Sequence, residues 1–338
     1  MKIKAWGTRG SIAVSNDKTV NVGGNTTCFE IKSKCLPAGA KLIVDAGTGF
    51  VPAGQSYIGE FFSGNDLNYH ILFTHYHWDH ILGLTLSPPT FINQIPMTLY
   101  GPVDNHTDTQ IMVQYLFERP FFPVDSGKFA HKMNHVTLDD FDVKLIIVHP
   151  LSGFKIMDLE SFNSIESQVT IQGETRDIGE CMIITMTPAN HGNSTCISYR
   201  FEEKPTGKVF VLLTDHEDTA GISMDMRNHL RDADLLIIDG QYDESKYHGK
   251  GGFSTAGFGH GTAFGAVKHG LVGGVKKIGI THHDPSSTDI HLSQVIYNEA
   301  IDSIDTILGN LKEKYNISDT SLLPSDIFLC KDYDEYEI

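Results

Sequence analysis

The sequence is short of basic residues. Lysine and arginine together number 26 against 42 aspartates and glutamates, which gives a net charge of −16 with histidine neutral. A surface with this charge repels a long polyanion, so we expect no long nucleic acid among the partners of this protein. Any nucleic-acid substrate should therefore be small.

Long hydrophobic runs are absent as well. No stretch of about 18 apolar residues, the length that spans a bilayer, occurs in the chain. The first residues, MKIKAWGTRGSI, lack the apolar centre of a secretory signal peptide. We therefore expect a cytoplasmic protein that makes no contact with a membrane.

Closely spaced cysteines are missing too. The chain has five cysteines and no CxxC pair, which argues against a disulfide framework and against a thiolate zinc site. We expect these cysteines to be buried free thiols. Histidine is abundant instead, with 17 residues, several of which follow apolar runs directly.

Apolar runs rich in β-branched residues alternate with helical patterns. The predicted strands, which read as buried on both faces, are 41–45, 70–74, 143–148, 182–187, 209–214, 235–239 and 277–281. The predicted helices, in which apolar residues return every three or four positions, are 223–232, 262–269 and 289–315. No linker or repeat interrupts the pattern, so we expect one domain, 1–338. The least regular stretch, 88–136, includes a predicted helix at 109–117 and is expected to be a lid-like insertion over a site.

The strongest chemical signal is the run Thr-His-Tyr-His-Trp-Asp-His at 74–80, directly after a predicted strand. Residues i and i+2 of an extended segment point the same way, so His75 and His77 can converge on one ion. Asp79 and His80 lie where the chain turns into a helix and should face a second ion. These ligand types suit zinc, manganese or iron, and zinc is the default because no redox ligand set is evident.

Three more ligands are expected at other strand ends. His191 can complete the first site, although a loop histidine is often structural. Asp215 can bridge two cations about 3.5–4 Å apart, unless its carboxylate caps a helix instead. His282 follows its strand as His75 follows its own, and His283 is the alternative ligand at that position.

These spacings resemble the metallo-β-lactamase superfamily, whose members carry a THxHxDH motif followed by a distant histidine, a bridging aspartate and a final histidine. The resemblance covers essentially the whole chain. It implies an α/β fold of the αββα sandwich type, with two mixed β-sheets packed face to face and helices on the outer faces. It also implies two divalent metal ions, the first held by His75, His77 and His191, the second by Asp79, His80 and His282, with Asp215 bridging both.

Further motifs are similar to those of one branch, the phosphodiesterase-like group related to ribonuclease Z and the phosphonate-pathway cyclic phosphodiesterases. They lie at 7–12, 23–28, 100–102, 121–124, 239–242 and 259–262. Other branches fit less well. Common metallo-β-lactamases place a cysteine at the position of Asp215, flavodiiron proteins need a glutamate in place of His77, and ribonuclease Z proper uses a basic glycine-rich arm that this chain lacks.

Several residues outside the ligand set are also candidates. His260 follows a glycine-rich stretch, so we predict that it reaches the site from a mobile loop and donates a proton to the leaving oxygen; the alternative is a surface histidine. Asp79 is the second predicted catalytic residue. Asp45 is expected to tie its loop together by accepting backbone N–H bonds, and Arg9 and Asn25 are candidates for contact with substrate.

The predicted function is hydrolysis of a small anionic phosphodiester, a cyclic nucleotide or a related metabolite, by a hydroxide that bridges the two metals. The alternative enzyme is a thioester or lactone hydrolase of the glyoxalase II kind, which shares the same ligands. The alternative outside enzymes is a metal-stabilised ligand sensor. A homodimer is a further expectation.

Overall fold

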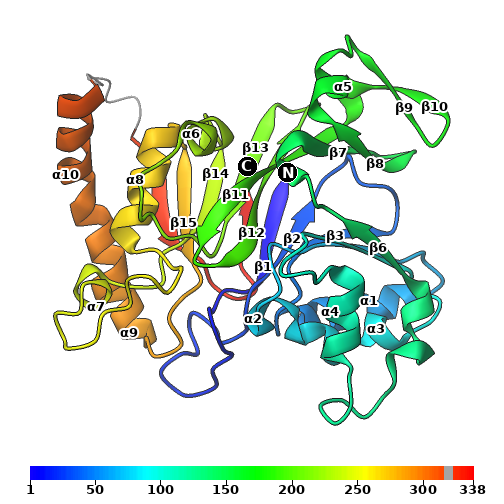
Figure 1. Ribbon diagram of the computed structural model, residues 1–338, viewed down its shortest axis with the longest axis horizontal. Helices are drawn as coiled ribbons and strands as arrows, with labels where there is room; N and C mark the ends of the chain where they lie inside the picture. The colour runs from blue at the N-terminus through cyan, green and yellow to red at the C-terminus, as the bar shows by residue number, and fades with distance from the viewer. Residues whose placement is uncertain (316–322) are drawn as a thin grey trace.

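The computed structural model describes residues 1–315 and 323–338. In this part of the chain, two mixed β-sheets pack face to face and helices cover both outer faces (Figure 1). The predicted αββα sandwich is therefore confirmed. The two ends of the described chain lie near each other because β17 (Glu335–Glu337) pairs with β1 (Lys2–Gly7).

The first sheet is built from the amino-terminal part of the chain. Within the described residues its strand order is β17-β1-β2-β3-β4-β5-β6. The remaining strands are β2 (Cys28–Lys32), β3 (Ala40–Val44), β4 (Asn68–Leu72), β5 (Met97–Gly101) and β6 (Met133–Thr137). The strands from β3 to β6 are parallel, whereas β17, β1, β2 and β3 pair antiparallel.

The second sheet has the order β16-β15-β14-β13-β12-β11-β7-β8 in the described chain. Its strands are β7 (Lys144–His149), β8 (Gly153–Asp158), β11 (Met182–His191), β12 (Ser194–Glu203), β13 (Lys208–Leu213), β14 (Leu235–Asp239), β15 (Lys277–Thr281) and β16 (Asp326–Leu329). The strands from β13 to β16 are parallel, so the carboxyl ends of β13, β14 and β15 meet at one edge. A separate hairpin joins β9 (Gln168–Ile171) to β10 (Glu174–Asp177).

Helices form the two outer layers (Figure 1). Those of the amino-terminal half are α1 (Phe50–Phe62), α2 (Trp78–Ile81), α3 (Pro88–Phe91), α4 (Thr109–Leu116) and α5 (Leu159–Asn163). Those of the carboxyl-terminal half are α6 (Met224–Leu230), α7 (Glu244–Tyr247), α8 (Ala263–Gly273), α9 (Asp289–His291), the π-helical turn η6 (Leu292–Ile296) and α10 (Tyr297–Tyr315). The described residues also form short 3-10 turns, namely η1 (Leu82–Thr85), η2 (Ser126–Lys128), η3 (Ala130–Lys132), η4 (Phe141–Val143) and η5 (Ile178–Glu180).

Strand alternation explains why the central strands are apolar on both faces. In β14, Leu235 and Ile237 join the core between the sheets, whereas Leu236 and Ile238 pack in the cluster that includes α8 and α10. In β3 the partition is the same, with Ile43 facing the cluster that contains α1 and α4. Each sheet thus buries one face against the other sheet and one against helices, which fixes the four layers.

Most sequence predictions of secondary structure are confirmed. Each predicted strand overlaps an observed one, and the helices predicted at 109–117, 223–232, 262–269 and 289–315 are present, the last interrupted by η6. Strand β5 lies inside the stretch 88–136 that is predicted to be an insertion, β6 overlaps its end, and both strands belong to the first sheet. A lid role for residues 102–132, between these strands, stays a prediction.

All five cysteines are buried and free, as expected. No helix among the described residues combines the length and apolarity that crossing a bilayer requires.

Candidate metal centre

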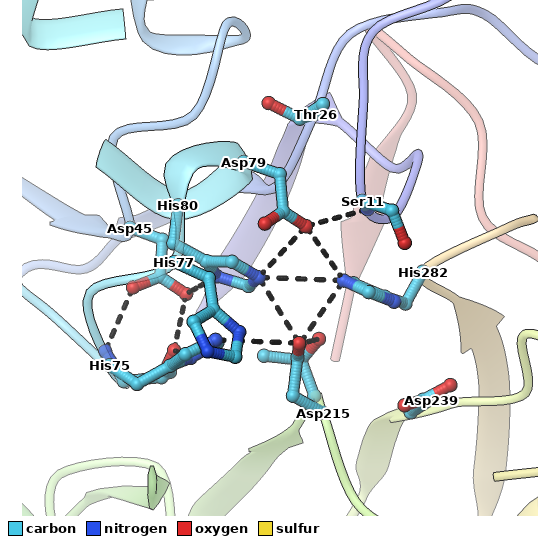
Figure 2. A network of polar contacts seen from close by, with 12 residues as sticks. Ser11, Thr26, Asp45, His75, His77, Asp79, His80, Asp215, Asp239 and His282 are labelled. Atoms are coloured by element: carbon cyan, nitrogen blue, oxygen red, sulfur yellow. Dashed lines mark hydrogen bonds and ion pairs between the residues drawn. The ribbon is translucent and has the colours of Figure 1, made fainter. Parts of the chain in front are cut away.

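The carboxyl ends of several strands place polar side chains in one space between the sheets. Asp215 and His282 follow the parallel strands β13 and β15, and Asp239 is the last residue of β14. The histidine-rich run at 74–80 follows β4 in the opposite sheet, and His191 is the last residue of β11. Figure 2 shows the side chains of Asp79, His80, Asp215 and His282 pointing toward one another, with His77 beside them.

The first group contains His75, His77, His191 and Asp215, with one donor atom from each within 4.8 Å of the others. Nε2 of His191 lies 3.0 Å from Nδ1 of His77. Oδ2 of Asp215 lies 3.5 Å from Nε2 of His75 and 3.6 Å from Nε2 of His191. Three imidazole nitrogens and one carboxylate oxygen therefore converge, the kind of ligand set that zinc takes.

The second group contains Asp79, His80, His282 and Asp215, within the same limit of 4.8 Å. Oδ1 of Asp215 lies 3.2 Å from Nε2 of His80 and 3.3 Å from Nε2 of His282. Oδ2 of Asp79 lies 3.1 Å from the same atom of His282. The two oxygens of Asp215 thus face different groups, as a bridging ligand requires.

Each of His77, His191 and His282 forms a hydrogen bond through the ring nitrogen that points away from the centre, which leaves its other ring nitrogen free to bind a metal. Nδ1 of His191 donates to the Gly259 carbonyl oxygen, and Nδ1 of His282 donates to Oε1 of Gln241. Such bonds fix both the tautomer and the orientation of a ligand histidine. Ser194 Oγ lies 3.2 Å from Nε2 of His77, the ring nitrogen that does not face His191.

Asp45 orients one histidine of each group. Its Oδ2 accepts from Nδ1 of His80 at 2.8 Å and from the Thr74 hydroxyl at 2.8 Å. Because the Thr74 hydroxyl proton points to Asp45, its oxygen accepts from Nδ1 of His75 at 3.0 Å. Asp45 also accepts from the Thr74 backbone N–H, which is the loop-tying role predicted for it. Sequence pattern alone does not show that the same carboxylate reaches a histidine of both donor groups.

One orphaned atom tests whether the cluster fits a metal. Nε2 of His75 is buried and has no hydrogen-bond partner among the described residues. A buried polar atom without a partner is costly, and a cation at the centre of the first group would supply one. Burial also lowers the pKa of His75 well below its usual value, which keeps the ring neutral and able to bind metal. The donor set therefore fits two divalent cations.

The carboxylates and the neighbouring imidazoles shift one another's pKa values. Burial opposes a charge on His80, but Asp215, Asp79 and Asp45 outweigh it and raise its pKa. Burial likewise opposes a charge on Asp79, but His80 and His282 hold its pKa well below the usual range. The Ser11 backbone N–H, 2.7 Å from Oδ2 of Asp79, adds a hydrogen bond to that carboxylate. The centre thus favours ionised carboxylates.

His260 and Asp239 form a pair beside the two groups. Nδ1 of His260 donates to Oδ2 of Asp239 at 2.9 Å and lies 4.0 Å from Oδ2 of Asp215. The His260 ring stacks on His282 with the ring centroids 4.7 Å apart. Burial opposes its charge, but Asp239 raises the pKa of His260 to about 9. His260 is 8 % exposed, so the alternative of a surface histidine is wrong, and Asp239 is a functional candidate that the sequence reasoning missed.

The geometry bears on two other sequence expectations. Nε2 of His283 donates to the Cys330 carbonyl oxygen at 2.8 Å, and the donor groups contain His282 and not His283. Arg9 is fully buried and its guanidinium donates to the carbonyl oxygens of Asp284 and Ser287, so its predicted contact with substrate is wrong. Asn25 bonds Tyr333 through its side-chain amide, and a contact between Asn25 and substrate stays a prediction.

No protein-family model matches the sequence, and no curated protein matches it. Solved structures do match, over nearly the full length of both chains. The metallo-β-lactamase fold protein YhfI from Bacillus subtilis is 14% identical with a TM-score of 0.55, and the alignment covers 99% of each chain. The short form of human tRNase Z is 15% identical with a TM-score of 0.53, covering 100% of this chain and 99% of that one. A diphosphatase from the PhnP family is 16% identical with a TM-score of 0.52, covering 100% and 97%. The four layers and these likenesses together show that this chain has the metallo-β-lactamase fold.

Proposed function

We propose that this protein is a two-metal hydrolase that cleaves a small phosphodiester, such as a cyclic nucleotide or a related metabolite. The observation that carries the proposal is the shared carboxylate of Asp215, whose two oxygens each face a separate set of three further ligand residues. We propose zinc as the metal, with manganese or iron as alternatives, because imidazole and carboxylate ligands suit all three.

Two bound divalent cations would supply an activated water and neutralise the charge that develops on a phosphoryl oxygen. The chain's own residues would supply the remainder. Asp215 and Asp79 would be carboxylate ligands of the ions, and Asp45 fixes the orientation of His80 directly and of His75 through Thr74.

His260 supplies the proton for the leaving oxygen. Its Nδ1 is bonded to Asp239, which leaves Nε2 as the nitrogen able to donate, and the Asp239 carboxylate favours the protonated ring. Positioned general acids of this kind contribute roughly 10²- to 10⁴-fold to a rate. Asp239 accepts two further hydrogen bonds, from the backbone N–H groups of His216 and Gln241, so the pair is anchored to the end of β14.

Two considerations support a small phosphorus ester. Solved structures with this fold include a diphosphatase of the PhnP family and a tRNase Z, whose names describe cleavage of phosphorus compounds. The net charge of −16 disfavours a long polyanion, so we propose a compact anionic substrate rather than transfer RNA. The cytoplasmic location and the homodimer stay predictions.

A comparison of substrates tests the proposal. The purified protein, stripped with a chelator and then given zinc or manganese, would be assayed on bis-p-nitrophenyl phosphate, on a thioester and on a lactone. We expect turnover of the phosphodiester that depends on added metal. Metal-dependent turnover of the thioester or lactone alone would favour the glyoxalase II kind of enzyme, and no turnover at all by an intact metal-loaded protein would favour a sensor.

A further inference from the structure

Glu217 is a buried glutamate two residues after the bridging Asp215, and its exposed fraction is 2 %. Its side chain accepts three hydrogen bonds. Oε1 accepts from the Gly257 N–H at 2.7 Å and from the Tyr247 hydroxyl at 2.6 Å, and Oε2 accepts from the Gly259 N–H at 2.9 Å. One carboxylate thus holds the glycine-rich segment before His260 and the end of α7.

The held segment reaches a metal ligand through Gly259. The Gly259 carbonyl oxygen accepts from Nδ1 of His191 at 2.7 Å. Gly259 has φ +86°, and a Cβ at this position would lie 2.4 Å from Nδ1 of His191, so only glycine allows so close an approach. Because the Gly259 N–H is bonded to Glu217, the position of its carbonyl depends on that carboxylate.

Glu217 also fixes the strand end that carries His191. Its backbone N–H donates to the Asn190 carbonyl oxygen at 2.8 Å, and Nδ2 of Asn190 donates to the Glu217 carbonyl oxygen at 2.7 Å. The residue before His191 is therefore bonded to the Glu217 backbone, while the ring of His191 is bonded to a loop that the Glu217 side chain holds.

We propose that Glu217 is a positioning residue of the first metal site, acting through the Gly259 carbonyl to keep Nε2 of His191 aimed at that site. The proposal rests on the two-metal function above. A glutamine has one acceptor oxygen and an NH₂ group that would face a backbone N–H, so it cannot accept from both glycines. The loop, and with it the His191 ring, would then lose its fixed orientation.

The test measures metal binding at each site separately. The His80→Ala background isolates the first site and the His77→Ala background isolates the second. In each background, the E217Q variant would be compared with the protein that keeps Glu217. Zn²⁺ affinity would be measured by competition with a chromophoric chelator, and the geometry of the site would be followed by the visible spectrum of bound Co²⁺. We expect E217Q to weaken binding at the first site by about 10- to 100-fold, the usual cost of losing a partner of a ligand histidine, and to alter the first-site Co²⁺ spectrum. Binding at the second site should change less than about twofold.

Two further variants separate positioning from general destabilisation. Glu203 is another buried glutamate with hydroxyl donors, Ser33 and Thr206, but it ends β12 at the end opposite Ser194, so E203Q should leave both metal affinities unchanged. Y247F removes the hydroxyl that donates to Glu217 and keeps the ring, and it should weaken the first site by a smaller factor than E217Q.

Equal loss at both sites in E217Q, or unchanged first-site affinity in both E217Q and Y247F, would overturn the positioning role. If E217Q does not fold, Y247F alone decides. Absence of metal binding by the unsubstituted protein would instead contradict the proposed two-metal function, so the two failures are distinguishable.

Discussion

Oδ1 of Asp215 lies 3.3 Å from Nε2 of His282, although β14 separates the strands that these residues follow. Both residues are buried and both have a left-handed backbone, with φ of 55° for Asp215 and 59° for His282. Residues other than glycine rarely adopt this conformation unless their surroundings impose it, and such residues concentrate at functional sites. The parallel strand ends therefore turn a carboxylate and an imidazole into the same space.

Single substitutions should empty the two sites selectively. His80→Ala should remove mainly the second metal, because His80 belongs to the second group and its Nε2 faces Oδ1 of Asp215. His77→Ala should weaken the first metal, because His77 belongs to the first group. Elemental analysis after dialysis would show about one metal per chain in each variant, with different Co²⁺ spectra. Full occupancy in both variants would show that the site is misplaced.

Asp215→Ala should affect both sites at once. We expect kcat on an activated phosphodiester to fall by about a thousandfold, which corresponds to about 4 kcal/mol of transition-state stabilisation. Asp232 is a matched control, because it also has a left-handed φ, of 52°, but lies near the opposite end of β14. Steady-state kinetics of Asp232→Ala should be close to wild type; an equal loss in both variants would point to general damage.

If His260 is the general acid, the loss of activity in His260→Gln should depend on the leaving group of the substrate. An alkoxide leaving group needs a proton and a nitrophenolate does not, so kcat should fall by about 10²-fold or more for an alkyl ester and by much less for a p-nitrophenyl ester. Rates on a leaving-group series would show the difference. An equal loss across the series would assign His260 a structural role.

His229 should make stability depend on pH. Burial lowers the pKa of His229 from its usual 6.5 to about 3, and the ring bonds Thr187 and Ser198. Between these two pKa values, His229 is protonated in the unfolded chain but neutral in the folded chain. The free energy of unfolding is therefore unaffected by His229 above pH 6.5 and decreases as the pH falls from 6.5 toward 3. Urea unfolding between pH 7 and 4 should show a slope that is smaller in His229→Gln by up to about 1.4 kcal/mol per pH unit. An unchanged slope would contradict the account.

Much of the fold could be predicted from periodicity. Strands such as β14 and β15 are buried on both faces and read as continuous apolar runs. Strands β5 and β6 are harder to predict, because their apolar runs are short and include polar residues. Their place in the sheet depends on the pairing of β5 with β4 and of β6 with β5, across long stretches of sequence, which local pattern does not encode.

The candidate ligand residues were easier to predict than the residues that support them. Histidines and an aspartate just after apolar strands suffice to suggest His75 or Asp215, because strand ends meet at one edge. Glu217 bonds loop residues far away in sequence, and no spacing rule marks it. Gln241 lies in the motif at 239–242, but that motif does not reveal its bond to the His282 ring. Asp239 had a visible signal, a carboxylate at the end of an apolar strand, as at Asp45 and Asp215.

The metal content of the purified protein tests the central claim most directly. The two donor groups share Asp215 and each has three further ligands, so elemental analysis should find about two divalent metal ions per chain, and a chelator-stripped sample should take up about two on titration. A content near zero after mild purification, with no uptake of zinc, manganese or iron on titration, would contradict the two-metal centre.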